Sequence, residues 1–321
     1  MEKGPIVTVL HDGKLPDPHL MTPVAERATV RYTEADRLAD ALRGADVLFV
    51  YDFLSRAIPG AWPAADRLRW VHMAATGVDP VMFDELIASD VLVTNTRGVF
   101  DRPIAEYVLA QILNFAKGLP ESRRLQARRQ WRHRDGELIS GATALVVGTG
   151  SIGRAIARLL RAVGMTVRAV GRRARAQDPD FGVVSDDLYA ELGRADYVIA
   201  IAPLTPATRH MFGARAFAAM APRARFINVG RGELVVTDDL VAAVRSGTIA
   251  GAALDVVDPE PLPSGHPLWD LPEVLITPHN SGDTAGWREE LVAAFTGNFA
   301  NWIEGRPLDN VVDKELGYVP A

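Results

Sequence analysis

The segment Ala144–Gly153 constrains the fold of this chain most, because it reads as a strand, a glycine turn and a helix. The apolar run Leu145–Val147 ends at the turn Gly148–Gly153 (GTGSIG). Apolar residues then recur at helical spacing from Ile156 to Val163. In such a turn the first glycine permits the tight bend, the second lets a pyrophosphate approach the backbone, and the third lets the helix pack closely on the strand.

Amide groups and the positive end of the helix dipole then hold phosphates. We therefore predict a dinucleotide site at this turn. A glycine turn in a non-binding α/β domain and a methyltransferase-type cofactor site are the alternatives.

Length and composition narrow the class of protein. A chain of 321 residues exceeds the usual size of one core, which predicts two domains. A hydrophobic content of 48% and a charged content of 23% are ordinary for a soluble globular protein. The net charge of -5 argues against a nucleic-acid partner.

The absence of cysteine excludes disulfides and thiolate metal sites, and the seven histidines include no HxxxH or HExxH pair, so we expect no metal. No signal-peptide core and no long apolar span is present. We expect a cytoplasmic protein without a membrane partner.

The first part of the chain, up to about Asn95, alternates short apolar segments with helical patterns, which predicts a parallel sheet covered by helices. The expected strands are Ile6–Leu10, Thr29–Tyr32, Val47–Tyr51, Leu68–Met73 and Val91–Thr94, and the helical patterns are Glu34–Leu42 and Pro80–Ala88. The loop Ala74–Asp79 follows a strand, so its amides are placed to hold a small anion. A plain turn with Asp79 as the N-cap is the alternative.

Two helical stretches precede the glycine turn. Asp101–Lys117 has one apolar face, and Gly118 is its expected stop. Glu121–Arg134 is rich in arginine, which predicts a solvated face or a subunit contact. A second α/β unit begins at about Gly141.

Its strands are expected at Ala144–Val147, Thr166–Val170, Tyr197–Ile201, Arg225–Val229, Ala250–Leu254 and Val274–Thr277. A last helix, Thr284–Glu304, should return to the first part of the chain.

The residues after each strand of the second unit are the candidates for chemistry, because open parallel sheets bind ligands beyond the carboxyl ends of their strands. After the glycine turn, these segments are Gly171-Arg172-Arg173, Ala202–Thr205, Gly230-Arg231-Gly232, Asp255 with Glu260, and Pro278–Gly282. The fold therefore brings Arg231, Glu260 and His279 to one rim.

A guanidinium, a carboxylate and an imidazole together can reduce a 2-oxo acid. Arg231 would bind the carboxylate or keto oxygen with its planar fork. His279 would donate a proton to the oxygen, and Glu260 would hydrogen-bond the other imidazole nitrogen. Taken singly, His279 is equally well a loop histidine and Glu260 a surface acid, whereas Arg231 lies between two glycines without an obvious packing role.

Several motifs in one order resemble the D-isomer-specific 2-hydroxyacid dehydrogenases, the family of D-glycerate, glyoxylate/hydroxypyruvate and phosphoglycerate dehydrogenases. The resemblance covers nearly the whole chain. Its motifs are GTGSIGRAIA (Gly148–Ala157), NVGRGELV (Asn228–Val235), ALDVVDPEPLP (Ala253–Pro263), TPHNSG (Thr277–Gly282) and GVFDRPIAEYVLA (Gly98–Ala110). It implies that Arg231 binds substrate, that His279 is the acid/base, and that Glu260 pairs with His279.

The resemblance implies further binding roles. The loop at Thr76 and Gly77 would hold the substrate carboxylate with its amides. Cofactor contacts are implied for Gly148, Gly150, Ser151, Ile152 and Gly153 at the pyrophosphate, Thr208 and Val229 at the nicotinamide half, and Asp255 at the carboxamide.

The family's layout implies two Rossmann-like, doubly wound parallel-sheet domains with a cleft between them. The substrate-binding domain would comprise residues 1–98 plus 286–321, and the dinucleotide-binding domain residues 99–285. The family also implies a homodimer formed through the cofactor domain and the long helices, here about Asp101–Trp131.

One departure concerns the cofactor. Many members that use NAD carry an acid at the end of the second strand, where this chain has Gly171-Arg172-Arg173. An arginine there favours a 2′-phosphate, and Gly171 would leave room for it. We therefore expect NADP(H) to be preferred, with NAD(H) possible; the alternative is that both arginines point into solvent.

The sequence thus predicts an enzyme that reduces a small 2-oxo acid to the D-2-hydroxy acid and catalyses the reverse reaction. An NAD-linked phosphoglycerate or formate dehydrogenase relative is one alternative. A non-catalytic dinucleotide-sensing protein, like the corepressors that share this fold, is the other.

Overall fold

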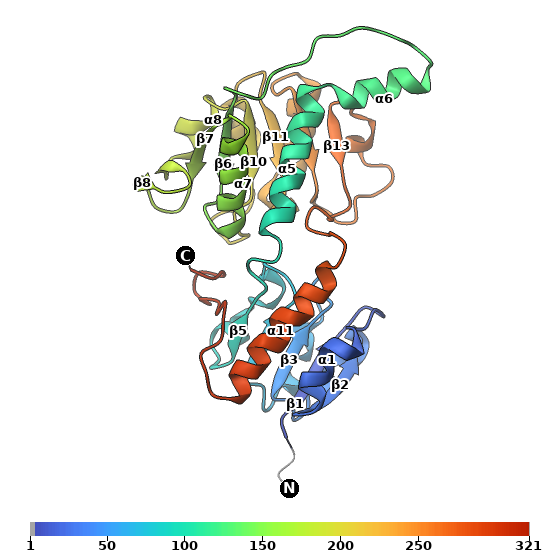
Figure 1. Ribbon diagram of the computed structural model, residues 1–321, viewed down its shortest axis with the longest axis vertical. Helices are drawn as coiled ribbons and strands as arrows, with labels where there is room; N and C mark the ends of the chain where they lie inside the picture. Colours follow the sequence, from blue (N-terminus) through green and yellow to red (C-terminus); the bar gives the residue numbers. More distant parts are fainter. Residues whose placement is uncertain (1–3, 321) are drawn as a thin grey trace. The chain divides into compact units, whose positions relative to one another are not determined.

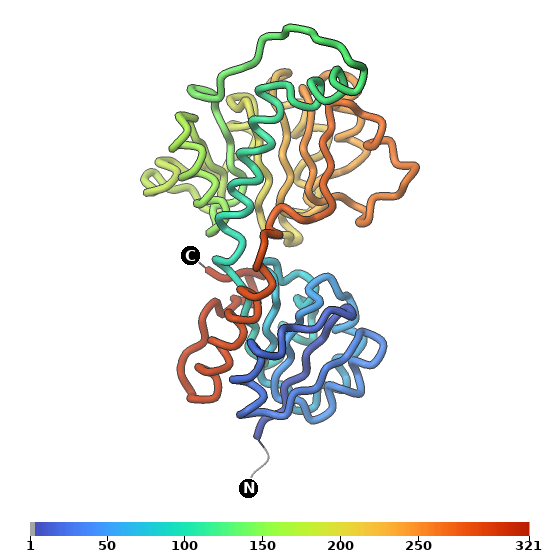
Figure 2. Tube along the Cα trace, turned by 45° about the vertical axis from the view of Figure 1, so that its right-hand side comes forward, coloured from blue at the N-terminus to red at the C-terminus, as the bar shows by residue number. Residues whose placement is uncertain are grey.

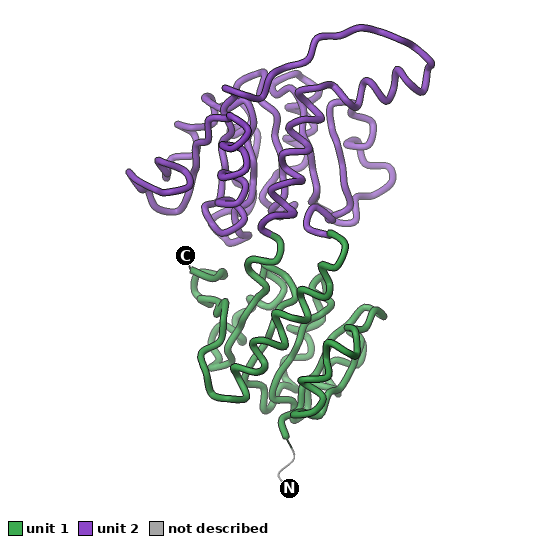
Figure 3. Tube along the Cα trace, in the orientation of Figure 1, with its two compact units in different colours: residues 1–100, 284–321 green, residues 101–283 purple. Residues whose placement is uncertain are grey.

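The computed structural model describes residues 4–320 and divides the chain into two compact units (Figure 3). The first unit comprises the residues up to Phe100 together with those from Thr284 onward, and the second is Asp101–Asp283. The assignment of substrate binding to the first unit (1–98 plus 286–321) and of dinucleotide binding to the second (99–285) stays a prediction.

The first unit is a five-stranded sheet in the order β2-β1-β3-β4-β5, with every neighbouring pair parallel. Its strands are β1 (Ile6–Leu10), β2 (Thr29–Thr33), β3 (Val47–Val50), β4 (Trp70–Met73) and β5 (Leu92–Thr94). Its helices are α1 (Pro18–Ala25), α2 (Leu38–Leu42), α3 (Ile58–Ala61), α4 (Asp84–Ile87) and α11 (Trp287–Ile303). Helix α11, red in Figures 1 and 2, belongs to this unit as predicted and packs against α1.

The two faces of this sheet carry different cores, because successive side chains of a strand point to opposite faces. On the face covered by α11, the Phe49 ring stacks on the Phe295 ring with 4.1 Å between centroids. Trp70 and His72 lie beside the same ring. The opposite face packs the alternate residues of β3 and β4 against α2, α3 and α4.

The second unit is an eight-stranded sheet in the order β13-β12-β11-β10-β6-β7-β9-β8 (Figure 1). The strands are β6 (Thr143–Val147), β7 (Thr166–Val170), β8 (Arg175–Asp178), β9 (Gly182–Ser185), β10 (Tyr197–Ala200), β11 (Arg225–Asn228), β12 (Gly251–Leu254) and β13 (Val274–Ile276). All pairs are parallel except β8 with β9. The carboxyl ends of the parallel strands therefore meet at one edge.

Helices cover both faces of this sheet. Helix α5 (Asp101–Ala116) packs against α7 (Ser151–Ala162) on one face. Helices α8 (Leu188–Leu192), α9 (Ala214–Ala218) and α10 (Thr237–Arg245) enclose the apolar core on the other. The predicted doubly wound, parallel α/β fold is confirmed for both units.

Several predicted elements differ from the structure. Helix α6 spans Leu119–Ala127, so the helix predicted to reach Arg134 is wrong. Arg129 has a φ of 55°, which a continuing helix does not allow. Glu34–Leu42 and Pro80–Ala88 are each a 3₁₀ turn and a short α-helix rather than one helix. Helix α1 and the hairpin of β8 and β9 were not predicted.

Candidate active site

The glycine turn after β6 lies where the strand order reverses, between β6 and β10. A side chain at Gly148, whose φ is 122°, would come within 2.6 Å of the Ile201 backbone. A side chain at Gly153 would come within 2.1 Å of the Gly148 carbonyl oxygen. Neither position accepts a residue other than glycine, so the tight turn and the close helix packing expected there are both present.

The same turn presents an open, donor-rich surface. A side chain at Gly150 would meet nothing within 4 Å. The first helical hydrogen bond of α7 runs from the Arg154 amide to the Gly150 carbonyl, so the amides of Ser151, Ile152 and Gly153 precede it. No described residue accepts from them, and no side chain caps the helix. This end of α7 fits a phosphate or pyrophosphate.

Arg172 and Arg173 follow β7, as predicted, and both are exposed. A side chain at Gly171 would lie 2.9 Å from the Thr149 Oγ1 atom, so this position favours glycine, while the expectation that it leaves room for a phosphate stays a prediction. The Gly171 amide donates to the Ser185 carbonyl of β9 at 2.9 Å. Arg172 and Arg173 therefore follow a backbone position that a hydrogen bond fixes to the end of β9.

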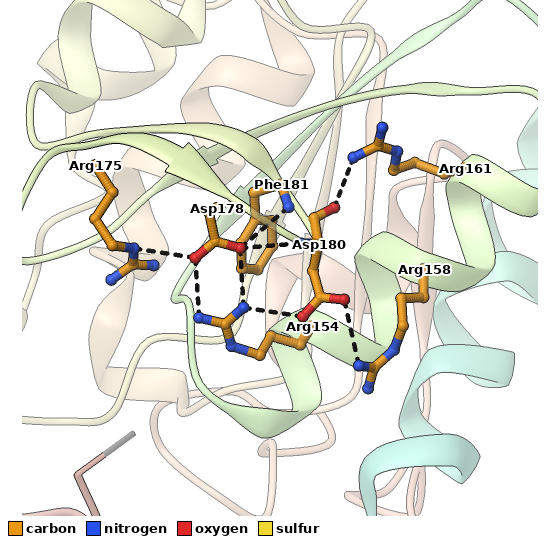
Figure 4. A network of polar contacts seen from close by, with 7 residues as sticks. All are labelled: Arg154, Arg158, Arg161, Arg175, Asp178, Asp180 and Phe181. Carbon is orange, nitrogen blue, oxygen red and sulfur yellow. Dashed lines mark hydrogen bonds and ion pairs between the residues drawn. The ribbon is translucent and has the colours of Figure 1, made fainter.

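An arginine–aspartate network fixes the hairpin of β8 and β9 to α7 (Figure 4). Arg154, in the first turn of α7, binds both carboxylate oxygens of Asp178 at 2.9 Å and also binds Asp180 at 2.9 Å. Arg175 donates to Asp178 from the other side at 3.0 Å. Burial alone would raise the pKa of Asp178, but the Arg154 bonds and two backbone amides outweigh it and lower that pKa to about 2.

Arg231 lies after β11 and is half-buried. Its Nη1 atom donates to the Gly230 carbonyl at 2.9 Å, and the Asn228 side chain donates to the Arg231 carbonyl at 2.9 Å. A side chain at Gly232 would come within 1.9 Å of the Val257 carbonyl oxygen. The glycine at position 232 therefore lets the loop that carries Arg231 approach the loop after β12 closely.

Glu260 and His279 are hydrogen-bonded, with 2.6 Å between Oε1 and Nδ1. Both side chains are part-exposed, at 34% and 26%. The Nδ1 contact leaves Nε2 as the ring nitrogen that faces away from the carboxylate. His279 has a φ of 51°, an uncommon backbone conformation for a residue other than glycine. The predicted pairing at the sheet edge is present, whereas the roles of the two residues stay a prediction.

Asp255, at the end of β12, organises the loop that carries His279. It is buried, and its carboxylate accepts hydrogen bonds from the Thr277 hydroxyl at 2.6 Å and from the amides of Asn280 and Ser281 at 3.0 Å each. The Thr277 hydroxyl also contacts the Tyr107 hydroxyl of α5 at 2.7 Å. Tyr107 and Thr277 were not predicted as site residues, although both lie inside the quoted motifs.

Thr208 and Val229 lie after β10 and β11. The Thr208 hydroxyl donates to the Pro203 carbonyl at 2.6 Å and accepts from the Thr205 amide at 2.9 Å. Thr208 thus fixes the loop after β10, while Val229 is buried. Their predicted contacts with the nicotinamide half stay predictions.

Thr76 and Gly77 lie in the first unit, in the loop after β4. Their amides donate to no residue within 4–320, and the Asn95 side chain donates to the Thr76 carbonyl at 2.6 Å. The Thr76 hydroxyl is buried and has no hydrogen-bond partner in that same range. A loop with fixed carbonyls and unused amides suits a small anion.

No helix within 4–320 combines the length and apolar character needed to cross a bilayer. The same residues contain no cluster of three or more His, Asp or Glu side chains able to hold a metal ion.

Comparisons with known proteins agree on one family. Residues 109–281 match the family model described as "D-isomer specific 2-hydroxyacid dehydrogenase, NAD binding domain". Glyoxylate/hydroxypyruvate reductase B of Salmonella agona is 31% identical over 292 residues, which cover 89% of this chain and 88% of that protein.

Solved structures extend the likeness to nearly the whole chain. The NADPH-dependent glyoxylate/hydroxypyruvate reductase of Sinorhizobium meliloti, in complex with NADP and sulfate, has a TM-score of 0.83 and 28% identity. The alignment covers 98% of this chain and 100% of that one. A D-isomer specific 2-hydroxyacid dehydrogenase of Xanthobacter autotrophicus, in complex with NADPH and MES, has a TM-score of 0.83, 29% identity and the same coverage.

Proposed function

The chain belongs to the D-isomer-specific 2-hydroxyacid dehydrogenase family, and on that premise we propose that it reduces a small 2-oxo acid to the D-2-hydroxy acid, with NADPH preferred over NADH. The enzyme also catalyses the reverse reaction. The single observation that carries the proposal is the 2.6 Å hydrogen bond between Glu260 and His279 at the carboxyl edge of the second sheet.

The residues at the glycine turn fit a dinucleotide. Gly150 leaves open space, and the amides of Ser151, Ile152 and Gly153 offer donors to its pyrophosphate. When bound, the nicotinamide supplies the hydride that reduces the keto carbon. We propose that the loops of Thr208 and Val229 contact the nicotinamide half of the cofactor. The Asp255 carboxylate, which can accept a further hydrogen bond, would bind the carboxamide.

His279 is the proton donor in this proposal. Its Nδ1 atom is held by Glu260, so Nε2 is the nitrogen available to the keto oxygen. The Glu260 carboxylate orients the ring, so that Nε2 is directed at the oxygen as it develops negative charge. In the reverse direction, the same nitrogen accepts the hydroxyl proton.

Arg231 binds the substrate carboxylate or keto oxygen. Its planar fork can form two parallel hydrogen bonds to a carboxylate, which a lysine cannot form. The unused amides of Thr76 and Gly77, in the first unit, support their own predicted role in binding a small carboxylate. Recognition of a carboxylate would favour a 2-oxo acid over an uncharged ketone.

The cofactor preference rests on Arg172 and Arg173. Both side chains are exposed at the end of β7, where the adenosine ribose lies in this fold. The Sinorhizobium and Xanthobacter structures hold NADP and NADPH, respectively. We propose that the arginine pair binds the 2′-phosphate.

We further propose that the protein forms a homodimer through α5, α6 and the segment that follows. Trp131 is fully exposed and Leu138 is 80% exposed, which is apolar surface that a second copy would cover. Analytical ultracentrifugation of the wild type and of Trp131→Glu tests this assembly. A monomeric wild type would refute it. The cytoplasmic location stays a prediction.

The proposed activity is tested by assaying the purified protein against glyoxylate, hydroxypyruvate, pyruvate and bulkier 2-oxo acids with each cofactor. His279→Ala should lower kcat by roughly two to four orders of magnitude, the usual contribution of a positioned acid. His133→Ala is the matched control, because the His133 side chain is 94% exposed. Near-normal turnover of His279→Ala would refute the assignment.

The same assay separates the alternatives. An NAD-linked phosphoglycerate or formate dehydrogenase relative would act on its own substrate with NADH. A dinucleotide-sensing binding protein would bind NADPH in calorimetry and turn over none of the 2-oxo acids.

A further inference from the structure

The backbone around His279 is held in an uncommon conformation by hydrogen bonds to one buried residue, Asp255. The His279 φ of 51° is disfavoured for a residue with a Cβ atom, and such backbone persists only where its surroundings fix it. The His279 amide donates to the Asp255 carbonyl at 2.8 Å, and the next two amides donate to the Asp255 carboxylate. The position of the imidazole therefore depends on how firmly Asp255 is held.

Asp255 is held in turn by two hydroxyl groups in series. The Thr277 hydroxyl donates to Asp255 Oδ1 at 2.6 Å. Since its one proton is used there, the Tyr107 hydroxyl must be the donor in the 2.7 Å contact with Thr277. Burial raises the pKa of Tyr107 to about 12, so this donor proton is retained.

We propose that Tyr107 and Thr277 are positioning residues for His279, acting through Asp255. Tyr107 O–H donates to Thr277, Thr277 donates to Asp255, and Asp255 folds the loop that aims the imidazole at the substrate. Hydrogen bonds in such a series reinforce one another, since each polarises the next. This inference rests on the proposed role of His279 as the proton donor.

The geometry explains why this series of hydrogen bonds should affect turnover more than substrate binding. Thr277 precedes His279 by two residues, and its hydroxyl points to Asp255 and Tyr107 rather than to the turn that fits the pyrophosphate. A displacement of about 1 Å in a catalytic group can cost roughly 100-fold in rate. Loss of the hydroxyl should therefore lower kcat and leave the KM for the 2-oxo acid, whose carboxylate is assigned to Arg231, nearly unchanged.

The test compares Thr277→Val, which keeps the side-chain shape and removes the hydroxyl, with Thr277→Ser, which keeps the hydroxyl. We expect Thr277→Val to lower kcat roughly 10- to 100-fold, with the KM for the 2-oxo acid within about twofold. Thr277→Ser should restore kcat to within about threefold of the wild type. Thr166→Val, at an exposed position of β7, is the matched control. Wild-type kcat in Thr277→Val would overturn the inference.

A spectroscopic measurement on the protein without substrate is independent of turnover. The short Glu260–His279 hydrogen bond should give a downfield imidazole proton resonance, assigned by its loss in His279→Gln. This resonance should broaden or disappear in Thr277→Val and persist in Thr277→Ser. An unchanged resonance in Thr277→Val would also overturn the inference.

Three further outcomes keep the test decisive. If Thr277→Val does not fold, Tyr107→Phe removes the outer hydrogen bond of the series and keeps the ring, and wild-type kcat with an unchanged resonance in that variant would overturn the inference. If His279→Ala retains wild-type turnover, the proposed function fails. If His279→Ala is inactive while Thr277→Val matches the wild type, this inference alone fails.

Discussion

His72 makes the stability of the first unit depend on pH. The side chain is fully buried among Phe49, Trp70 and Phe295. Its Nδ1 atom contacts the Thr94 hydroxyl at 2.7 Å, whereas its Nε2 atom is buried and has no partner within residues 4–320. Protonation would leave a charged ring with an N–H that nothing accepts, so burial lowers the pKa of His72 from 6.5 to about 3.

The direction of the effect follows from the two protonation states. Below pH 6.5 the unfolded chain binds a proton at His72 that the folded chain does not bind, so acid favours unfolding until pH falls to about 3. Between pH 8 and pH 5 this linkage removes about 2 kcal/mol from the free energy of opening of the first unit. The loss is large beside the ~5–15 kcal/mol that stabilises a typical domain.

Amide hydrogen exchange of β4 measures this free energy locally, which a global unfolding curve of a two-unit chain does not. His72→Phe keeps an aromatic ring in the stack and removes the titrating group. Between pH 8 and pH 5, the decrease in the opening free energy of this variant should therefore be smaller than that of the wild type by about 2 kcal/mol. The exposed His133 provides the control, since His133→Phe should keep the wild-type dependence. Identical pH dependence in the wild type and His72→Phe would refute the reasoning.

Four substitutions in the second unit give further predictions. Arg231→Lys should raise the substrate KM and lower kcat, because a point charge does not reproduce a bidentate fork; steady-state kinetics equal to the wild type would make Arg231 structural. Arg172→Ala and Arg173→Ala should each lower kcat/KM for NADPH about tenfold or more and leave NADH within a few fold, since a charge-assisted contact is worth ~1.5–3 kcal/mol. Arg245→Ala is the exposed control, and parallel loss with both cofactors would argue against phosphate recognition. Asp178→Asn should cost ~3 kcal/mol in denaturant unfolding of the second unit, because it leaves two arginines without their buried carboxylate, and a cost below ~1 kcal/mol would contradict this account.

The strands were predictable because parallel sheets bury both faces of each strand. Runs such as Val47–Val50 and Tyr197–Ala200 are fully buried in the structure and are continuously apolar in the sequence. By contrast, β8 reads RAQD and is held by the distant Arg154 through Asp178. Because the two residues lie far apart in the sequence, local periodicity does not indicate their contact, and this strand was not predicted.

Among helix ends and site contacts, too, some were predictable from the sequence and others were not. The arginines after Glu121 fit a helix as well as a loop, and local charge does not show that the chain turns at Arg129. The rule that ligands bind at the carboxyl ends of parallel strands predicted, from the sequence alone, that Glu260 and His279 lie close together. It did not reach Tyr107, because that residue lies mid-helix and its contact with Thr277 spans 170 positions.

The return of α11 to the first sheet has a consequence for synthesis on the ribosome. The strands of the first unit emerge first, yet the Phe295 ring that covers Phe49 and Trp70 emerges only after every strand of the second sheet. The unit that begins the chain is therefore the last to be completed. Until α11 has been translated, an aromatic face of the first sheet stays uncovered in the nascent chain and is accessible to chaperones.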